Sequence, residues 1–445
     1  MSLFSETLEL LRELIGNACV NDLTADSGGE RRTAETLKAF FAETPNVQVA
    51  EFEPHPGRVS VIFTVAGQDP GAEPLTLMGH TDVVPVDRDA WSREPFAAEV
   101  EDGVLYGRGA MDMLFITAAM AAVTRDVARS GRPAGTLTFA ALADEEARGG
   151  LGAGWLAEHA PEAMSWKNAL SETGGAHLPV ADGSDAVVIY VGEKGAAQRR
   201  LSVTGDAGHG STPFGRDSAI AKIGEVARRI ADLRPPVTDS PTWRGFVRAF
   251  RFDPATEEAL LADSGEDACG LWRSGRIRAR FLARHVLADG AARRRADQRV
   301  ALPSVARNGY PPASRPGPGH YRRPVARRPR GYGRRGDHRA VDLRAGDRVP
   351  RRGPLWDALV ATVQEEFPAA AIVPVLATGG SDLRFARKLG GVGYGFALHG
   401  AGRDLAAVNR QLHAHDEHVH LEDVELTVAA YRRLVERFVV SPEAD

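Results

Sequence analysis

The sequence predicts an α/β fold, with a mixed sheet between helices, on three observations. Leu75–Met78 and Thr136–Ala143 are short β-prone runs, and polar residues begin where each run stops. Met113–Val127 has the largely apolar character of a buried helix. MSLFSETLELLRELIG and PLWDALVATVQEEF each carry the apolar spacing of an amphipathic helix. In open α/β sheets ligands bind at the carboxyl edge of the strands, so the polar residues behind the two runs are candidates for a site.

Length and composition agree with this class. The chain has 445 residues, of which 43% are hydrophobic, and this predicts two domains with a substantial core. It has no run of about 18 apolar residues and no signal-peptide pattern, so we expect a cytoplasmic protein without a membrane segment. Cys19 and Cys269 are the two cysteines of the sequence, which excludes a disulfide framework.

The polar candidates are acids and histidines at the ends of apolar runs. Carboxylates and imidazoles are the ligands that zinc and similar ions take, and a bridging carboxylate allows a handful of them to hold two ions. A single acid behind a strand is more often a helix cap or a solvated loop residue, and only the shared context favours a two-metal hydrolase. The candidates are His80 and Asp82 in LTLMGHTDVVP, Asp112 in GRGAMDM, Glu145 and Glu146 in LTFAALADEEARGG, Glu172 in LSETGG and His413 in LHAHDEHV.

Six motifs occur in the order found in a known family. The six motifs are GHTDVVP, GRGAMDM, DEE followed by glycines, ETGG, GHGSTP and HxxDE. In sequence and order they resemble the motifs of the M20 metallopeptidases. This family includes aminoacylases, carboxypeptidases, dipeptidases and the succinyl-diaminopimelate and acetylornithine deacylases. The resemblance covers Ser5 to about Ala283 and resumes at about Gly353. It implies a catalytic domain in two pieces, residues 1–191 and 354–445, with an inserted α+β lid and dimerisation domain at 192–353.

The resemblance also implies the role of each candidate. Two divalent ions would be bound, with zinc favoured by ligand type and cobalt or manganese fitting the same donors. Asp112 would bridge the ions, Glu145 would be the general base, and Asp82 would accept the second ring N–H of His80. The HxxDE spacing selects His413 over His415. The implied metal ligands are His80, Asp112, Glu146, Glu172 and His413.

Two further segments are candidates for substrate contacts. His209 in GHGSTP lies between a β-prone run, Arg199–Thr204, and a helix-like segment, Ser218–Leu233; such a histidine is by its setting more often structural. The resemblance instead implies that it stabilises the oxyanion in the partner subunit's site, and hence a homodimer. ATGGSDLRFARKLGG resembles the family's substrate loop, although a plain turn with Ser381 as N-cap explains it equally well. Its candidate donors are Gly379, Gly380, Ser381 and Arg384, the last for a carboxylate.

The predicted substrate has an amide bond beside a free carboxylate, as in an N-acyl amino acid or a short peptide. GHTDVVP, WSREPF, VGEKG and HAHDE look more like the aminoacylase and carboxypeptidase branch of the family than the diaminopimelate branch.

Residues 284–352 break the pattern. They contain 19 Arg, 5 Asp, no Glu and no Lys, a net charge of +14 in a chain of −4, together with eight prolines. A basic arm for nucleic acid, a disordered linker and a shifted reading frame each explain this composition. We favour the shifted frame, because the family's Asn-Val-Ile-Pro motif and DxR strand are missing here and a clean helix pattern resumes after Gly353. Two alternatives to an active enzyme follow: a metal-binding protein whose disrupted lid impairs catalysis, and, against the acidic balance of the remainder, a nucleic-acid-binding protein.

Overall fold

The computed structural model describes residues 2–193, 201–211, 214–233, 241–262, 352–377 and 379–440. The arginine-rich segment 284–352 lies almost wholly outside these ranges, so its three explanations stay predictions. In the described part of the chain no helix has the length and apolar character needed to cross a bilayer.

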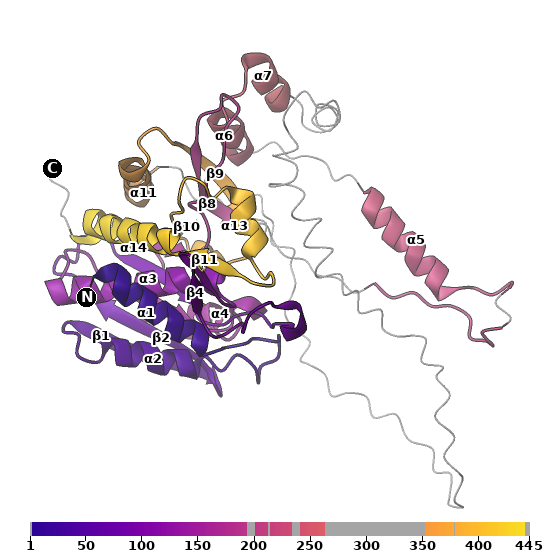
Figure 1. Ribbon diagram of the computed structural model, residues 1–445, viewed down its shortest axis with the longest axis horizontal. Coiled ribbons are helices and arrows are strands. Elements are labelled where there is room, and N and C mark those ends of the chain that lie inside the picture. Colours follow the sequence, from indigo (N-terminus) through magenta and orange to yellow (C-terminus); the bar gives the residue numbers. More distant parts are fainter. Residues whose placement is uncertain are drawn as a thin grey trace, which may run out of the picture.

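A mixed sheet of eight strands forms the centre of the molecule (Figure 1). The strand order is β1-β2-β6-β3-β7-β10-β8-β9. The four central strands β6, β3, β7 and β10 run parallel, whereas β1, β2 and β8 each pair antiparallel with a neighbour. The strands are β1 (Val47–His55), β2 (Arg58–Val65), β3 (Leu75–His80), β6 (Leu137–Leu142), β7 (Asn168–Ser171), β8 (Ala186–Glu193), β9 (Ala371–Ala377) and β10 (Val392–Gly395).

The two β-prone runs of the sequence form neighbouring central strands. In β3 and β6 every residue is buried, as expected for parallel strands covered on both faces. Successive side chains alternate between the two faces, so Phe139 packs with Phe63 on one side and Ala140 with Ile62 on the other. The rings of Phe41, Phe63 and Phe139 stack at centroid distances of 4.3 Å and 5.8 Å.

Helices cover both faces of this sheet. The larger cluster of buried residues includes side chains of α1, α2, α3, α11, α13 and α14, and the smaller cluster those of α4 and α12. Helix α3 is buried along most of its length, which confirms the buried helix predicted there. The helices are α1 (Leu3–Gly16), α2 (Arg31–Phe41), α3 (Phe115–Ser130), α4 (Ala153–His159), α11 (Pro354–Glu366), α12 (Leu383–Lys388), α13 (Leu405–Gln411) and α14 (Leu421–Val435).

A small antiparallel sheet joins two segments that are far apart in the sequence. Strand β5 (Val104–Tyr106) pairs with β4 (Glu99–Glu101) on one side and with β11 (His418–His420) on the other. The β5–β11 ladder therefore brings the chain that leads to Asp112 beside the chain that leaves His413.

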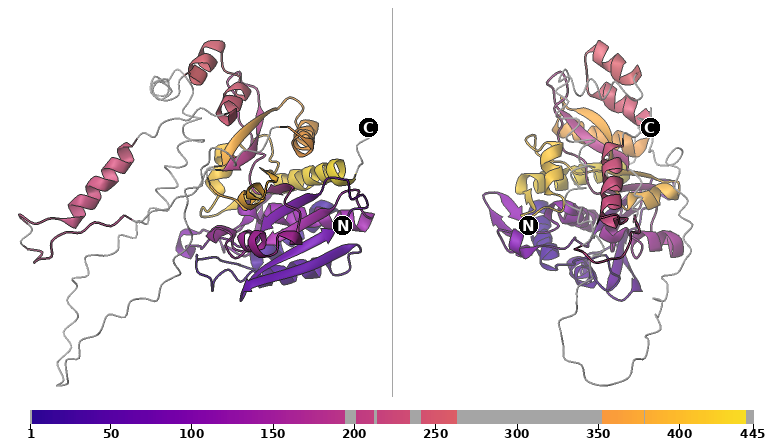
Figure 2. Two further views of the ribbon diagram at one scale, coloured as in Figure 1. Left: turned by 180° about the vertical axis from the view of Figure 1, so that it is seen from behind. Right: turned by 90° about the vertical axis from the view of Figure 1, so that its right-hand side faces the viewer.

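The segment predicted to insert a lid contributes α5 (Ala219–Asp232), α6 (Pro241–Ala249) and α7 (Pro254–Ala262). Helix α5 confirms the helix predicted at Ser218–Leu233, with the Ser218 hydroxyl accepting from the Ala221 N–H, and it stands apart from the sheet (Figures 1 and 2). Residues 201–204 of the β-prone run before it are not in a strand. Helix α6 packs against β9 of the central sheet through buried Phe246 and Val247. The domain limits at 191 and 353 stay a prediction.

Candidate metal centre

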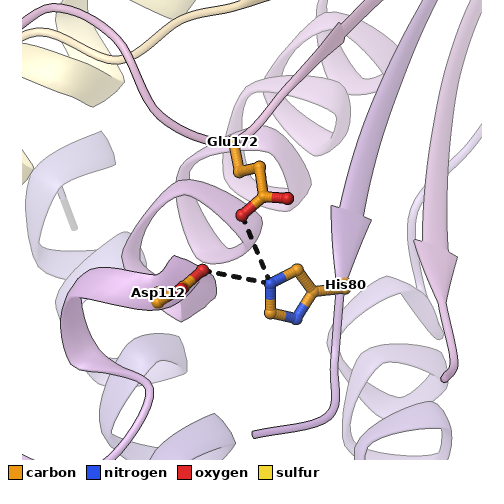
Figure 3. Close-up of side chains that lie close together, drawn as sticks. All are labelled: His80, Asp112 and Glu172. Atoms are coloured by element: carbon orange, nitrogen blue, oxygen red, sulfur yellow. Dashed lines mark hydrogen bonds and ion pairs between the residues drawn. The ribbon is translucent and has the colours of Figure 1, made fainter. Parts of the chain in front are cut away.

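Three of the predicted ligands meet at the carboxyl edge of the central sheet. His80 is the last residue of β3, Glu172 directly follows β7, and Asp112 lies in the short turn Ala110–Leu114 before α3. His80 Nε2 is 3.3 Å from Asp112 Oδ1 and 3.7 Å from Glu172 Oε2 (Figure 3). All three side chains are buried. One ligand atom from each lies within 4.8 Å of the others, a spacing that suits a bound metal ion.

A second group shares Asp112 with the first. His413 Nε2 is 3.2 Å from Asp112 Oδ2 and 3.2 Å from Glu146 Oε2, and the three ligand atoms again lie within 4.8 Å. Asp112 thus presents one carboxylate oxygen to each histidine. His415 is exposed and belongs to neither group, so the structure brings His413 and not His415 to Asp112. The role of His413 as a metal ligand stays a prediction.

The turns that carry these side chains have unusual backbone conformations. Asp144, Thr173 and His413 adopt left-handed φ angles of 69°, 65° and 61°. For residues other than glycine this conformation carries strain and is concentrated at functional sites. Asp144 immediately precedes Glu145, and Thr173 immediately follows Glu172. Each left-handed residue therefore redirects the chain at or next to a candidate side chain of the site.

The electrostatics of the site favour a bound cation. Burial and the nearby charge of Asp112 raise the pKa of Glu172 to about 8, and burial also raises the pKa of Glu146. Glu146 Oε1 and Glu172 Oε1 are buried without a hydrogen-bond partner among the described residues. A buried carboxylate oxygen without a donor is stabilised by a metal ion, which supplies positive charge beside it. The donor set of two imidazoles and three carboxylates therefore fits two divalent ions.

Glu145 faces the same site from the turn after β6. Burial, followed by the charge of Glu172, raises the pKa of its carboxyl well above the usual value. Arg384 Nη1 lies 3.8 Å from Glu145 Oε1. The neighbouring residue Glu146 belongs to the second ligand group, so Glu145 is held beside the ligands without being one of them.

Asp82 differs from its predicted use. The ring Nδ1 of His80 donates to the backbone carbonyl of Asp82 at 2.9 Å, while the Asp82 carboxylate lies 3.7 Å away. That carboxylate accepts the backbone N–H groups of Glu145 and Glu146, each at 3.1 Å, and the amide of Asn21 at 2.8 Å. The tautomer of His80 is thus held by the main chain of Asp82. The carboxylate instead holds the turn that carries Glu145 and Glu146.

A buried polar network behind this turn was not recognised in the sequence. Arg58 is fully buried and donates to Glu30 at 2.6 Å and to Asn21 at 3.2 Å, and it lies 3.5 Å from Asp144. Asn21 links this network to Asp82. The only sequence signal was Asp144 itself, the first acid of the DEE motif, because the other members come from separate elements.

The glycine-rich loop also differs from its prediction. The Ser381 N–H and hydroxyl both donate to Glu193 Oε2, at 2.8 Å and 2.6 Å, so neither donor points to a substrate. Ser381 is not an N-cap either, because Asp382 occupies that position without a side-chain cap bond. Arg384 donates to the backbone carbonyls of Ser381 and Arg148 beside the site, and Gly380 is exposed. Gly379, next to it, is half-buried.

His209 is not brought to either ligand group. It is exposed, and its Nδ1 lies 2.6 Å from the Ser211 hydroxyl, in the segment that leads to α5. The role predicted for it needs a partner subunit and stays a prediction.

Comparison with known proteins identifies the family. The model of the peptidase family M20/M25/M40 matches residues 76–437. Over 455 aligned residues the chain is 27% identical to the succinyl-diaminopimelate desuccinylase of Phenylobacterium zucineum (strain HLK1), covering 98% of this chain and 100% of that protein. It is 31% identical over 288 residues to the enzyme of the same name from Afipia carboxidovorans, covering 63% of this chain and 68% of that protein.

Solved structures share the fold over nearly the whole chain. The M20 family metallo-carboxypeptidase Sso-CP2 from Sulfolobus solfataricus superposes with a TM-score of 0.60 at 14% identity, covering 97% of this chain and 99% of that one. The dipeptidase Dug1p from Saccharomyces cerevisiae gives 0.56 at 12% identity, with 99% and 98% covered. The family model spans most of the chain, and both ligand groups lie inside the matched region. The chain therefore belongs to the M20/M25/M40 peptidase family, whose members are metal-dependent hydrolases of amide bonds.

Proposed function

We propose that this chain hydrolyses an amide bond beside a free carboxylate, in an N-acyl amino acid or a short peptide, at a site for two divalent ions. The observation that carries the proposal is the sharing of Asp112. Its two carboxylate oxygens lie 3.3 Å and 3.2 Å from His80 Nε2 and His413 Nε2, each within its own ligand group.

The proposed ligands are His80, Asp112 and Glu172 for one ion and Asp112, Glu146 and His413 for the other. Zinc is the proposed metal because imidazole nitrogen and carboxylate oxygen suit it, although cobalt or manganese accepts the same donors. Bound ions would supply Lewis acidity at the amide carbonyl and a lowered pKa for water at the site.

Glu145 is the proposed general base. It would take the proton from the attacking water and deliver it to the leaving nitrogen. Burial supports this role, because it raises the pKa of the carboxyl and so makes it a better proton acceptor near neutral pH. The backbone of Glu145 is held by Asp82, which keeps the carboxylate beside the ligands.

Two features bear on the substrate. The sequence relatives are named succinyl-diaminopimelate desuccinylases, whereas the solved structures are of a carboxypeptidase and a dipeptidase. The motifs preferred the aminoacylase and carboxypeptidase branch, and this preference stays a prediction. Arg384 lies beside Glu145 with a partly exposed guanidinium, and it is the proposed contact for the substrate carboxylate.

The decisive variant is Glu145→Gln. It should retain two ions and lower kcat by about 10²–10⁴-fold, because proton transfer is lost while the ligands remain. The measurement is metal content by mass spectrometry together with hydrolysis of a panel of N-acyl amino acids, dipeptides and N-succinyl-diaminopimelate. The exposed Glu158 on α4 is the matched control, and Glu158→Gln should behave as wild type. Unchanged turnover in Glu145→Gln would contradict the assignment, and bound metal without turnover in wild type would favour an impaired enzyme.

The resemblance further suggests a homodimer in which His209 of each chain completes the other chain's site. A mass measurement in solution tests it, and a monomer with full activity would contradict it. A cytoplasmic location is the corresponding proposal for the cell.

A further inference from the structure

We propose that Glu417, paired with Arg108, is a positioning residue that holds the Asp112 turn against the His413 turn. It thereby sets the affinity of the second ligand group, which consists of Asp112, Glu146 and His413, for its metal ion. The inference rests on the proposed function, because it concerns how the two-ion site is assembled. Neither residue is a ligand in either group.

Glu417 uses both carboxylate oxygens on the main chain around Asp112. Its Oε1 accepts the N–H groups of Met111 and Asp112, at 2.9 Å and 3.0 Å. Its Oε2 accepts the Gly109 N–H at 3.1 Å and the Arg108 guanidinium at 2.6 Å. Four donors on one fully buried carboxylate hold this turn in a single conformation.

The same residue lies in the turn of His413, four positions along the chain. Its backbone carbonyl accepts the Gly107 N–H at 2.9 Å, which continues the β5–β11 ladder to the edge of the site. Arg108 Nη2 reaches the His413 carbonyl at 3.5 Å. Side chain and main chain of Glu417 therefore join the turn of Asp112 to the turn of His413, although about 300 residues separate them.

The first ligand group, which consists of His80, Asp112 and Glu172, depends less on the Glu417 contacts for its geometry. His80 and Glu172 stand at the ends of β3 and β7, which pair in the central sheet. In the second group His413 comes from a loop and has a side chain that is 39% exposed. Loss of the Glu417 contacts should therefore change the second group more than the first.

The test compares zinc binding by the full-length protein and its variants. Glu417→Gln keeps the size of the side chain but leaves one acceptor oxygen where four donors converge, so part of the contact must break. Glu6→Gln is the matched control, because Glu6 accepts from Arg125 at the same 2.6 Å between α1 and α3, away from the site. Both zinc affinities are measured by competition with a chromophoric chelator, and thermal unfolding of the metal-free proteins reports the fold.

We expect Glu417→Gln to weaken one of the two zinc-binding steps by about 10–100-fold, with the other changing less. Glu6→Gln should lower only thermal stability. His413→Ala should lose the same step, and adding Glu417→Gln to it should alter the remaining step little. Unchanged affinities in folded Glu417→Gln, or an equal loss at both steps, would overturn the inference.

The failure of the proposed function has a different signature. A wild type that binds zinc at both steps but hydrolyses nothing would contradict the proposed hydrolysis alone, and a wild type that binds no zinc at either step would contradict the two-ion site itself. If Glu417→Gln does not fold, Arg108→Lys takes its place, because lysine keeps the charge beside Glu417 and loses the forked contact. A selective loss of the same zinc step in Arg108→Lys supports the inference, and wild-type affinities overturn it.

Discussion

The two ligand groups share Asp112 but are built in different ways. In the first, His80 and Glu172 stand at the ends of adjacent parallel strands, and His80 is 2% exposed. In the second, Glu146 and His413 come from turns outside the central sheet, and the His413 side chain is 39% exposed. The first group follows from strand pairing. The second depends on buried carboxylates that hold main-chain turns, Asp82 for Glu146 and Glu417 for the turn of Asp112.

A ligand at the end of a strand and a ligand in a turn are positioned by different contacts. Strand pairing aligns His80 with Leu142 of β6, so the sheet itself fixes the position of a ligand at the end of a strand. A turn has no such ladder and needs its N–H groups satisfied by side chains. The polar residues around the ligands are therefore as much a part of the second group as the ligands themselves.

The largest effect is expected from a substitution of Asp112, the residue that both ligand groups share. Asp112→Ala should abolish both groups together, so zinc content should fall from about two ions to none and hydrolysis to background. Loss of a ligand should weaken each affinity by more than the roughly 10–100-fold typical of an outer partner. Metal analysis after dialysis checks this result. Retention of one tightly bound ion would show that Asp112 does not serve both groups.

A smaller effect is expected from substitution of either histidine, and it should differ between the two ligand groups. His80→Ala and His413→Ala should each lose about one ion and keep the other, with activity reduced by on the order of 100-fold or more. Added imidazole should restore zinc binding in His413→Ala, because that side chain is 39% exposed, and not in His80→Ala, where it is 2% exposed. Titration of both variants with zinc, with and without imidazole, measures the difference. Equal rescue would remove the distinction between a buried and an open group.

The smallest expected effect is the release of protons when zinc binds. In the metal-free protein burial alone would lower the pKa of His413, but the charge of Glu146 and the hydrogen bond with Asp112 outweigh it and raise the pKa to about 11. The proton stabilises the metal-free fold fully below the unfolded pKa of about 6.5, and this contribution is lost as the pH rises towards 11. Zinc requires the neutral ring, so its binding should release a proton.

The zinc affinity should therefore rise by about tenfold per pH unit for each proton released, between pH 6 and 8. Calorimetry in buffers of different ionisation enthalpy counts the protons. His413→Ala is the control and should release fewer. A zinc affinity independent of pH would contradict the raised pKa.

Local patterns predicted the central elements well. The run Leu75–Met78 became β3 and Thr136–Ala143 became β6, because continuous apolar stretches suit strands buried on both faces. Met113–Val127 became most of α3, and Ser218–Leu233 became α5. The packing of α6 on β9 was not predicted, because it depends on two segments more than a hundred residues apart.

In the candidate site, too, the local motifs could be predicted and the contacts between distant elements could not. Each ligand candidate sits in a motif that can be read locally, and the structure brings all five together. The uses of Asp82 and Ser381 were predicted differently, because each depends on which donor or acceptor another element presents. Asp82 meets the N–H groups of Glu145 and Glu146, and Ser381 meets Glu193.

The α/β class, the order of the candidate ligand motifs and the family of the chain could be predicted from the amino-acid sequence. Apolar spacing is a local property and is sufficient for the α/β class, and the family follows from the resemblance of the six ordered motifs. The resemblance implied that Asp112 is shared, and the folded chain shows its two oxygens beside His80 and His413. The contacts of the Asp82 carboxylate with a turn rather than a ring, and of Glu417 with two remote turns, are visible only in the three-dimensional structure. Hydrogen bonds and ion pairs depend on distances of a few tenths of an ångström between atoms from distant segments, and spacing along the chain does not specify those distances.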